Sequence, residues 1–409
     1  MTEWPIVRFE EIAADEKSSF SKPYGSAFTK DDYVSDGVPL VRGVNLGNGV
    51  YHDDDYVFIT DEKADKLPGA NLAPGDLVIT HRGTIGQVSM IPRSPRYPRY
   101  VLSTSQVKAR LDPSRAVPEF YYYWLLSPAG QHEILSHVST VGVPGLVQPV
   151  ASVKGFKVPN PSLWEQRAAT EVLAALDDKI AINERIAAGA IELADAHFTS
   201  AAQELNFGPD TFGSAAKVVG GGTPSTKTEK YWGGGIAWTT PTDVTALSAP
   251  YLFETGRTVT GEGLENCASQ LYPAQSIFMT SRATIGAFAL PQIPAAVNQG
   301  FIVVLPPTEE LRWWLLHEMR SRVEEMISLA NGSTFLELSR KNFKAMPIRL
   351  ASDQALANFA QAVAPLHRRA SQATAESRSL ASLRDTLLPQ LMSGKLRVRD
   401  AEKIVENAV

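Results

Sequence analysis

The stretch HRGTIG, residues 81–86, returns as SRATIG at residues 281–286 of the 409-residue chain. The identical residues, 200 positions apart, are Arg82 and Arg282, Thr84 and Thr284, Ile85 and Ile285, and Gly86 and Gly286. Each copy follows a short apolar run, DLVIT or SIFMT, which is typical of a β-strand that ends in a turn. The repeat therefore predicts two copies of one strand-and-turn domain.

Weaker matches extend the repeat in the same order along both halves. PLVRGVN (39–45) aligns with AWTTPTD (237–243), Gln106 with Gln299, and Gln166 with Gln354. A period near 200 residues is far too long for a solenoid. We therefore expect a duplicated domain, over residues 1–160 and 206–350, with an appendage that is duplicated too.

The appendage is an Ala- and Leu-rich stretch, at 161–205 and again at 351–398, before a C-terminal tail at 399–409. Its apolar residues recur in steps of three and four, which is heptad spacing and predicts a helix that packs on a partner helix. The packing candidates are Leu173, Leu176, Ile180, Leu356, Phe359, Val363, Leu366 and Leu380. The simplest arrangement pairs the two stretches as an antiparallel coiled coil, although each alone could be an amphipathic surface helix.

The predicted fold class is therefore α+β, with two mixed, strand-rich domains joined by two long helices in a pseudo-twofold internal repeat. A helix over residues 165–200 would be about 54 Å long. That length is enough to hold two domains about 34 Å apart, which is one turn of DNA.

Charge is unevenly distributed along the chain, although the net charge is only −5. Residues 81–115 hold seven Lys and Arg against one acid, whereas residues 165–204 hold eight acids and three bases. Such segregation can present a basic face to nucleic-acid phosphates, although ordinary surface solvation gives the same pattern. Cys267 is the single cysteine, and the first residues, MTEWPIVRFEEI, do not resemble a signal peptide. We therefore expect a cytoplasmic protein without disulfides or a membrane span.

Catalytic signatures are missing from the sequence. GGGTPSTK (220–227) lacks the spacing of a phosphate-binding loop, and the seven histidines form no i, i+4 pair for a metal. We therefore predict no catalytic residue and no metal site, and binding rather than catalysis.

Four segments resemble the specificity subunits of type I restriction-modification systems, and the resemblance covers nearly the whole chain. They are GGTPSTKTEKYWGGGIAW (221–238), SIFMTSRATIG (276–286) followed by VNQGF (297–301), NGSTFLELSR (331–340) and SLRDTLLPQLMSGKLRV (382–398). The first half departs further from the family pattern, with KPYGSAFTKDDY (22–33) and HVSTVGVPGLVQP (137–149) at the corresponding places.

The resemblance implies that each duplicated domain is a target recognition domain that reads one half of a bipartite DNA sequence. It also implies that the helices set the spacing and dock two modification (adenine methyltransferase) subunits, followed by restriction (translocase and nuclease) subunits. Those partners would use S-adenosylmethionine, ATP and magnesium, and this chain, which would not be an enzyme by itself, would need no cofactor. The main alternative is a protein–protein adaptor with duplicated binding domains that never contacts DNA.

Arg, Asn and Gln are the usual direct readers of bases, and Lys and Arg the usual phosphate contacts. The first-half candidates for DNA binding are Arg42, Asn45, His81, Arg82, Thr84, Arg93, Arg96, Arg99, Gln106 and Lys108. The second-half candidates are Lys227, Lys230, Thr239, Thr240, Asp243, Ser281, Arg282, Thr284, Asn298, Gln299, Arg340, Lys341 and Lys344. In the repeated turn, Gly and Ile could serve the fold alone, whereas Arg and Thr could also contact phosphate.

Overall fold

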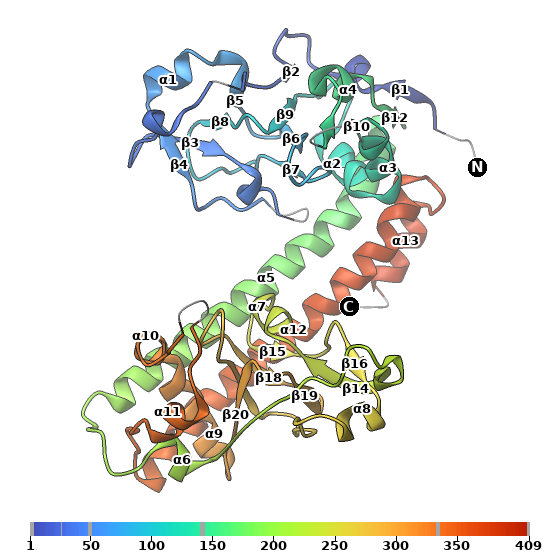
Figure 1. Ribbon diagram of the computed structural model, residues 1–409. Coiled ribbons are helices and arrows are strands. Elements are labelled where there is room, and N and C mark those ends of the chain that lie inside the picture. Colours follow the sequence, from blue (N-terminus) through green and yellow to red (C-terminus); the bar gives the residue numbers. More distant parts are fainter. Residues whose placement is uncertain (1–3, 26, 48–50, 140–143, 333–335, 407–409) are drawn as a thin grey trace. The chain divides into compact units, whose positions relative to one another are not determined.

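The computed structural model describes residues 4–25, 27–47, 51–139, 144–332 and 336–406. It forms two compact units, Met1–Asp178 with Ala381–Val409 and Lys179–Leu380. The boundaries between the units, after Asp178 and after Leu380, fall inside the two longest helices. These are α5 (Leu163–Ala202) and α12 (Asp353–Met392), which are labelled in Figure 1. Each unit thus contains one strand-rich lobe, called the first or second lobe below, and part of both helices.

The first lobe is built on two four-stranded sheets. One runs β2 (Phe20–Ser21), β9 (Gln106–Ala109), β6 (Leu77–Thr80) and β7 (Val88–Met90). The other runs β4 (Val57–Ile59), β3 (Val38–Val41), β8 (Tyr100–Leu102) and β5 (Asn71–Leu72). Two-stranded pairs join β1 (Ile6–Arg8) to β12 (Lys157–Pro159), and β10 (Val138–Ser139) to β11 (Gly145–Leu146). All four residues of β3, β6 and β9 are buried, so both faces of these strands are covered.

Short helices complete the first lobe. They are α1 (Asp61–Asp65), α2 (Pro118–Leu126), α3 (Pro128–Ser136) and α4 (Pro149–Gly155), with 3₁₀ turns at Phe9–Ile12, Lys30–Asp32, Gly43–Asn45 and Pro68–Ala70. Proline begins α2, α3 and α4, where the missing N–H costs no helical hydrogen bond. The aromatic run of α2 is largely buried, so this helix contributes to the core of the lobe.

The second lobe has a five-stranded and a three-stranded sheet. The first runs β13 (Lys217–Gly220), β20 (Phe301–Leu305), β17 (Ile277–Thr280), β18 (Phe288–Pro291) and β15 (Tyr251–Leu252). The second runs β16 (Thr258–Val259), β14 (Trp232–Thr239) and β19 (Ala295–Val297). Its helices are α6 (Phe212–Ala215), α7 (Pro241–Thr245), α8 (Gly261–Glu265), α9 (Glu309–Arg320), α10 (Val323–Ser328) and α11 (Arg340–Ala345), with a 3₁₀ turn at Glu229–Tyr231. Ser321 and Arg322 separate α9 from α10.

The two lobes share one strand topology, as the repeat predicts. The order β2-β9-β6-β7 recurs as β13-β20-β17-β18, and the parallel pair β3-β8 recurs as β14-β19. One detail of the sequence alignment is wrong, because the strand register pairs Thr80 with Gln106 but Thr280 with Phe301. Gln106 is thus equivalent to Phe301 and not to Gln299, which lies in the loop before the strand.

The repeated turns hold the chain in the same way in both lobes. Gly86 and Gly286 have φ of 91° and 85°, in the left-handed region where a side chain would be strained. Thr80 N donates to Gln87 O, and Thr280 N to Ala287 O, so each turn reverses the chain at the end of a buried strand. The glycines of the HRGTIG and SRATIG segments therefore serve the fold.

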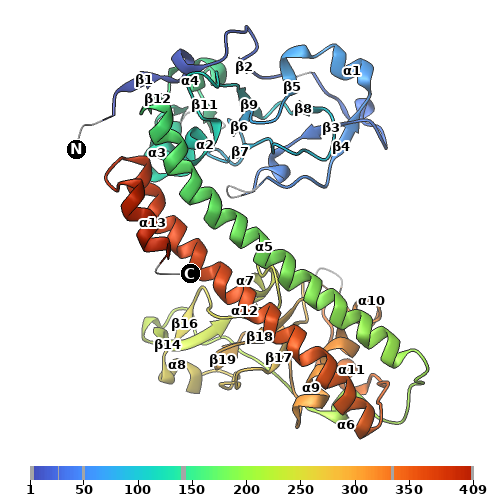
Figure 2. The same ribbon diagram turned by 180° about the vertical axis from the view of Figure 1, so that it is seen from behind.

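The helices α5 and α12 pack against each other in antiparallel fashion within the second unit, where Figures 1 and 2 both draw them side by side. Lys179 of α5 pairs with Glu376 at 3.1 Å, while the ring of Phe198, further along α5, packs on Phe359, nearer the start of α12. In the first unit, Asp177 accepts from Arg384 at 2.7 Å. Six of the predicted packing residues are buried, namely Leu173, Leu176, Leu356, Phe359, Val363 and Leu380, and Ile180 and Leu366 are half-buried.

Beyond α12, the predicted C-terminal tail contains a further helix, α13 (Val398–Glu406). Among the described residues, none of the helices is both long and apolar enough to cross a membrane.

Candidate nucleic-acid interface

Arg82 and Arg282 begin the repeated turns, but their surroundings differ. Arg82 is exposed and makes no ion pair with any residue that the structure describes. Arg282 is half-buried, and its Nη2 donates to Glu337 Oε1 at 3.0 Å. Thr84 and Thr284 are both exposed beside them. The turns thus place one free and one paired arginine at equivalent points of the two lobes.

Arg282 lies in a small cavity of the second lobe, with a volume of about 120 Å³. Four of the predicted DNA-binding residues line it, namely Ser281, Arg282, Gln299 and Arg340, together with Gly220, Gly221, Phe301, Glu337 and Leu338. Gln299 Oε1 also accepts from the hydroxyl of Thr223, the first residue of the TPSTK segment (223–227). The fold therefore brings two arginines to one point from segments more than 50 residues apart.

Six of the predicted residues are buried, namely Asn45, His81, Gln106, Lys108, Thr239 and Ser281. Asn45 Nδ2 donates to the carbonyls of His52 and Asp54, and Lys108 Nζ donates to Asn71 O at 3.0 Å. Burial lowers the pKa of Lys108, because the charged ammonium loses water inside the lobe. Burial therefore keeps these side chains from a ligand, except that of Ser281, which lines the cavity around Arg282.

Two candidates of the second lobe act as backbone caps. Asp243 accepts hydrogen bonds from the N–H and hydroxyl of Thr240 at the start of α7, and from Gly256 N at 2.8 Å. Asn298 Oδ1 accepts from Gly300 N at 2.8 Å, which fixes the turn before β20. Since their polar atoms already have partners, these side chains stabilise loops.

The proline-rich loop IPRSPRYPRY presents its arginines unequally. Arg93 pairs with Glu119 of α2, and Arg99 bonds Asp65 at 2.8 Å and Asn71 at 2.6 Å. Arg96 is exposed, with its guanidinium 5.5 Å from the ring centre of Tyr97. Arg42 likewise donates to Asp55 O at 2.8 Å. Arg96 is therefore the arginine of this loop best placed to meet a ligand.

Four lysines of the second lobe are exposed, namely Lys227, Lys230, Lys341 and Lys344. Lys230 forms an ion pair with Glu262. The motifs at 331–340 and 137–149 lie partly outside the described residues, at 333–335 and 140–143.

Two basic residues that sequence reasoning missed are placed beside these features. Arg257 lies 3.6 Å from the ring centre of Trp232, a geometry that stacks a guanidinium on an indole. Lys22 is the second: burial lowers the pKa of His81, and the charges of Lys22 and Arg82 lower it further. Lys22 is the first residue of KPYGSAFTKDDY, which takes the place of the family segment GGTPSTKTEKYW in the first half. That correspondence could have identified Lys22 as a candidate from the sequence.

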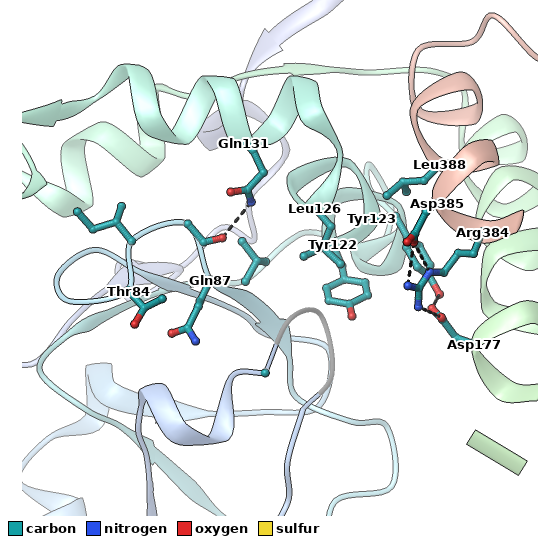
Figure 3. Close-up of a pocket in the computed structure, with 14 residues that line it drawn as sticks. Thr84, Gln87, Tyr122, Tyr123, Leu126, Gln131, Asp177, Arg384, Asp385 and Leu388 are labelled. Carbon is teal, nitrogen blue, oxygen red and sulfur yellow. Dashed lines mark hydrogen bonds and ion pairs between the residues drawn. The ribbon is translucent and has the colours of Figure 1, made fainter. Parts of the chain in front are cut away.

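A larger cavity, of about 450 Å³, separates the first repeated turn from the helices of the same unit (Figure 3). On one wall, Gln131 of α3 donates to Gly86 O at 2.9 Å and so anchors the turn. On the other wall, Arg384 bonds both Asp177 and Asp385, and the Tyr123 hydroxyl donates to Asp177 at 2.7 Å. This polar cluster joins α2 of the lobe to α5 and α12.

The second unit has a buried chain of hydrogen bonds at a comparable place. Tyr251 OH is 2.9 Å from His367 Nδ1, His367 Nε2 is 2.9 Å from His317 Nε2, and His317 Nδ1 is 2.6 Å from Asp195 Oδ1. Neutral rings can make all three hydrogen bonds: the Tyr251 hydroxyl donates to His367 Nδ1, His367 Nε2 donates to His317 Nε2, and His317 Nδ1 donates to Asp195. Arg320 adds two bonds to Asp195, at 3.0 and 2.7 Å. The chain couples the second lobe to both long helices.

This cluster should make the second unit acid-sensitive. Burial is the largest cause that lowers the pKa of both His317 and His367, and it brings the pKa of His367 to about 2. The charge of Arg320 lowers both pKa values further, and those of His317 and Arg312 also lower the pKa of His367. Only Asp195 raises the two pKa values. Below the ordinary value of 6.5, the unfolded histidines bind protons that the folded ones refuse, so stability falls as pH falls. At pH 5 we expect a loss of about 2 kcal/mol from His367. Melting temperatures at pH 7.5 and pH 5 measure it.

The matched control for this prediction is His197→Asn, since His197 is exposed on the same helix α5. His367→Asn should shrink the difference between the two melting temperatures, whereas His197→Asn should leave it as in the wild type. Equal differences in all three proteins would contradict the assignment.

Two lobes of one topology, each continued by a long helix that packs on the other, define a class of duplicated, helix-linked binding proteins. The chain belongs to the family described as the type I restriction modification DNA specificity domain, whose profile matches residues 2–190 and 211–361.

Similar proteins agree with this assignment. The specificity subunit of the type I restriction enzyme MjaIX from Methanocaldococcus jannaschii is 34% identical over 140 residues, 34% of this chain and 32% of the relative. That of HindI from Haemophilus influenzae is 23% identical over 183 residues, 44% of this chain and 39% of the relative. The matched parts thus span between about a third and two fifths of these relatives.

A solved structure shares the fold. The S subunit of a type I restriction-modification system from M. genitalium aligns with a TM-score of 0.58 at 17% identity, covering 96% of this chain and 99% of that chain. The similarity thus includes both lobes and both long helices, which confirms the predicted α+β duplicated architecture.

Proposed function

We propose that this chain is the DNA-recognition subunit of a type I restriction-modification complex and that each lobe reads one half of a bipartite target. The observation that carries the proposal is the family match over both halves, combined with one lobe topology that occurs twice. A duplicated reader suits a split target, because each copy can evolve its own base contacts while the shared framework stays the same. The family match favours this function over the adaptor hypothesis.

The partners follow from the same proposal. Two modification subunits would dock on the chain and methylate adenine with S-adenosylmethionine, and restriction subunits would add ATP- and Mg²⁺-dependent translocation and cleavage. This chain would supply recognition and assembly and no catalytic group. The protein would act in the cytoplasm, where host and invading DNA are both accessible.

We further propose which side chains meet the DNA. In the first lobe they are Arg82, Thr84 and Arg96, and in the second they are Lys227, Ser281, Arg282, Thr284, Gln299, Arg340, Lys341 and Lys344. All but Ser281 and Arg282 are exposed, and those two line the cavity that also holds Arg340. The paired residues Arg42, Arg93, Arg99 and Lys230 would first have to release their present partners.

Methylome sequencing tests the function directly. A host that expresses this chain with its modification subunit should acquire methylated adenines in one motif, made of two short specific segments separated by a fixed gap. The matched control expresses the modification subunit alone and should lack that motif. If both hosts show the same methylation, the proposed function is wrong.

A further inference from the structure

The strand register identifies equivalent residues around the two repeated turns. Val78 and Phe278 are equivalent, since each lies two residues before the end of its strand, and they pair with Lys108 of β9 and Val303 of β20. On their other side, Lys108 pairs with Ser21 and Val303 pairs with Val219, so Ser21 and Val219 are equivalent too. The next residue along is Lys22 in the first lobe and Gly220 in the second. A lysine of one lobe thus stands where the other has a glycine.

The residues opposite the repeated arginines differ as well. The backbone of Arg82 bridges to Gly145, and that of Arg282 bridges to Glu337. A few residues later, the first lobe has the uncharged pair Gln148–Pro149 where the second begins α11 with Arg340. Relative to the first lobe, the second therefore has Gly220 in place of Lys22, Arg340 and Lys341 in place of Gln148 and Pro149, and Glu337 in place of Gly145.

The glycine and the new arginine of the second lobe fit together sterically. A Cβ atom added to Gly220 would lie 3.1 Å from the Cδ, Nε and Cζ atoms of Arg340, so the guanidinium rests on the bare backbone. A lysine at position 220 would fill the space that Arg340 uses. The second lobe therefore carries a cation on α11 that packs against Gly220, the residue that corresponds to Lys22 of the first lobe.

Beside each repeated turn, these residues carry more positive than negative charge. In the second lobe, Glu337 bonds only one guanidinium nitrogen of Arg282, whose buried Nε has no hydrogen-bond partner among the described residues. Arg340 forms no ion pair with any residue in the described part of the chain. In the first lobe, Arg82 and Lys22 have no acid at the position of Glu337, which is Gly145. Two cations around a small polar cavity bind an anion of matching size.

We propose that each lobe holds an equivalent site for one DNA phosphate, built from Lys22 and Arg82 in the first lobe and from Arg282 and Arg340 in the second. The proposal rests on the proposed function and adds the chemistry of one contact per lobe. Glu337 holds Arg282 in place until a phosphate replaces its carboxylate. A phosphate fits better than a base, since a framework shared by two lobes with different target sequences must contact what all sequences share.

The test uses the full chain, alone and with its modification subunit, on a duplex of random sequence across a range of salt concentrations. Lys22→Gln and Arg340→Gln should each make the plot of log affinity against log salt shallower by about 0.9, the value of one phosphate contact. Glu337→Gln should tighten binding about threefold at low salt, since it removes the competing acid. Circular dichroism confirms that each variant is folded.

The matched controls are Lys17→Gln and Lys217→Gln, which remove the same charge from exposed positions earlier in each lobe. They should leave the slope unchanged. If Lys22→Gln and Arg340→Gln behave like these controls, or if Glu337→Gln weakens binding, the phosphate sites are wrong although the chain still binds DNA. If the wild-type chain retards no duplex even with its modification subunit, the proposed function itself fails.

Discussion

Seven residues added to both α5 and α12 are expected to abolish methylation of the native target and to create a target with a gap about three base pairs wider. Seven residues lengthen a helix by about 10.5 Å, and DNA rises about 3.4 Å per base pair. The insertions belong after Asp178 and after Leu380, where each helix passes from one compact unit to the other. One heptad keeps Leu176 and Ile180 on the packed face.

Methylome sequencing reads the gap directly, because the two specific segments of the methylated motif should stay the same while their separation grows. The same seven residues placed after α13 form the matched control and should leave the native motif intact. Methylation of the native motif by the doubly lengthened chain would show that the helices do not set the spacing.

The repeat and the heptads could be recognised because each leaves a periodic or duplicated pattern in the sequence. Glycine at a left-handed position and apolar residues at heptad spacing are required by local backbone and packing geometry. The duplication of the strand-rich domain could be predicted because a similar turn, HRGTIG in the first half and SRATIG in the second, follows an apolar run in both halves. The family segments then indicated what such a duplication is used for.

The polar residues were harder to assign, because an amide or carboxylate that caps a loop has the same chemistry as one that reads a base. Asp243 and Asn45 bond groups up to 13 residues away, which no local pattern reveals. Lys108 alternates with apolar residues as an exposed strand residue would, but β5 of the neighbouring sheet covers it. Only the strand register shows that Lys22 corresponds to Gly220, the residue against which Arg340 packs.

Glu318→Ala is expected to lower the free energy of unfolding of the second unit by about 3–5 kcal/mol, because it leaves buried arginine charge without its partner. Glu318 of α9 is fully buried. Its carboxylate accepts from Arg322 Nη1 at 2.9 Å and from Arg349 Nη2 at 2.8 Å. Arg322 is 6% exposed, so water cannot replace the lost carboxylate. Denaturant unfolding followed by tryptophan fluorescence measures the loss.

Glu325→Ala is the matched control, since Glu325 also pairs with Arg322, at 2.8 Å, but is 44% exposed. We expect it to cost at most about 1 kcal/mol, because solvent screens a surface pair. Equal losses in the two variants would mean that burial does not decide the strength of this cluster. The distinction matters for the proposed function, because Arg349 stands just before α12 and the cluster ties α9 of the second lobe to the start of that helix. A lobe that rotated on its helix could not hold its half of the proposed DNA target in register.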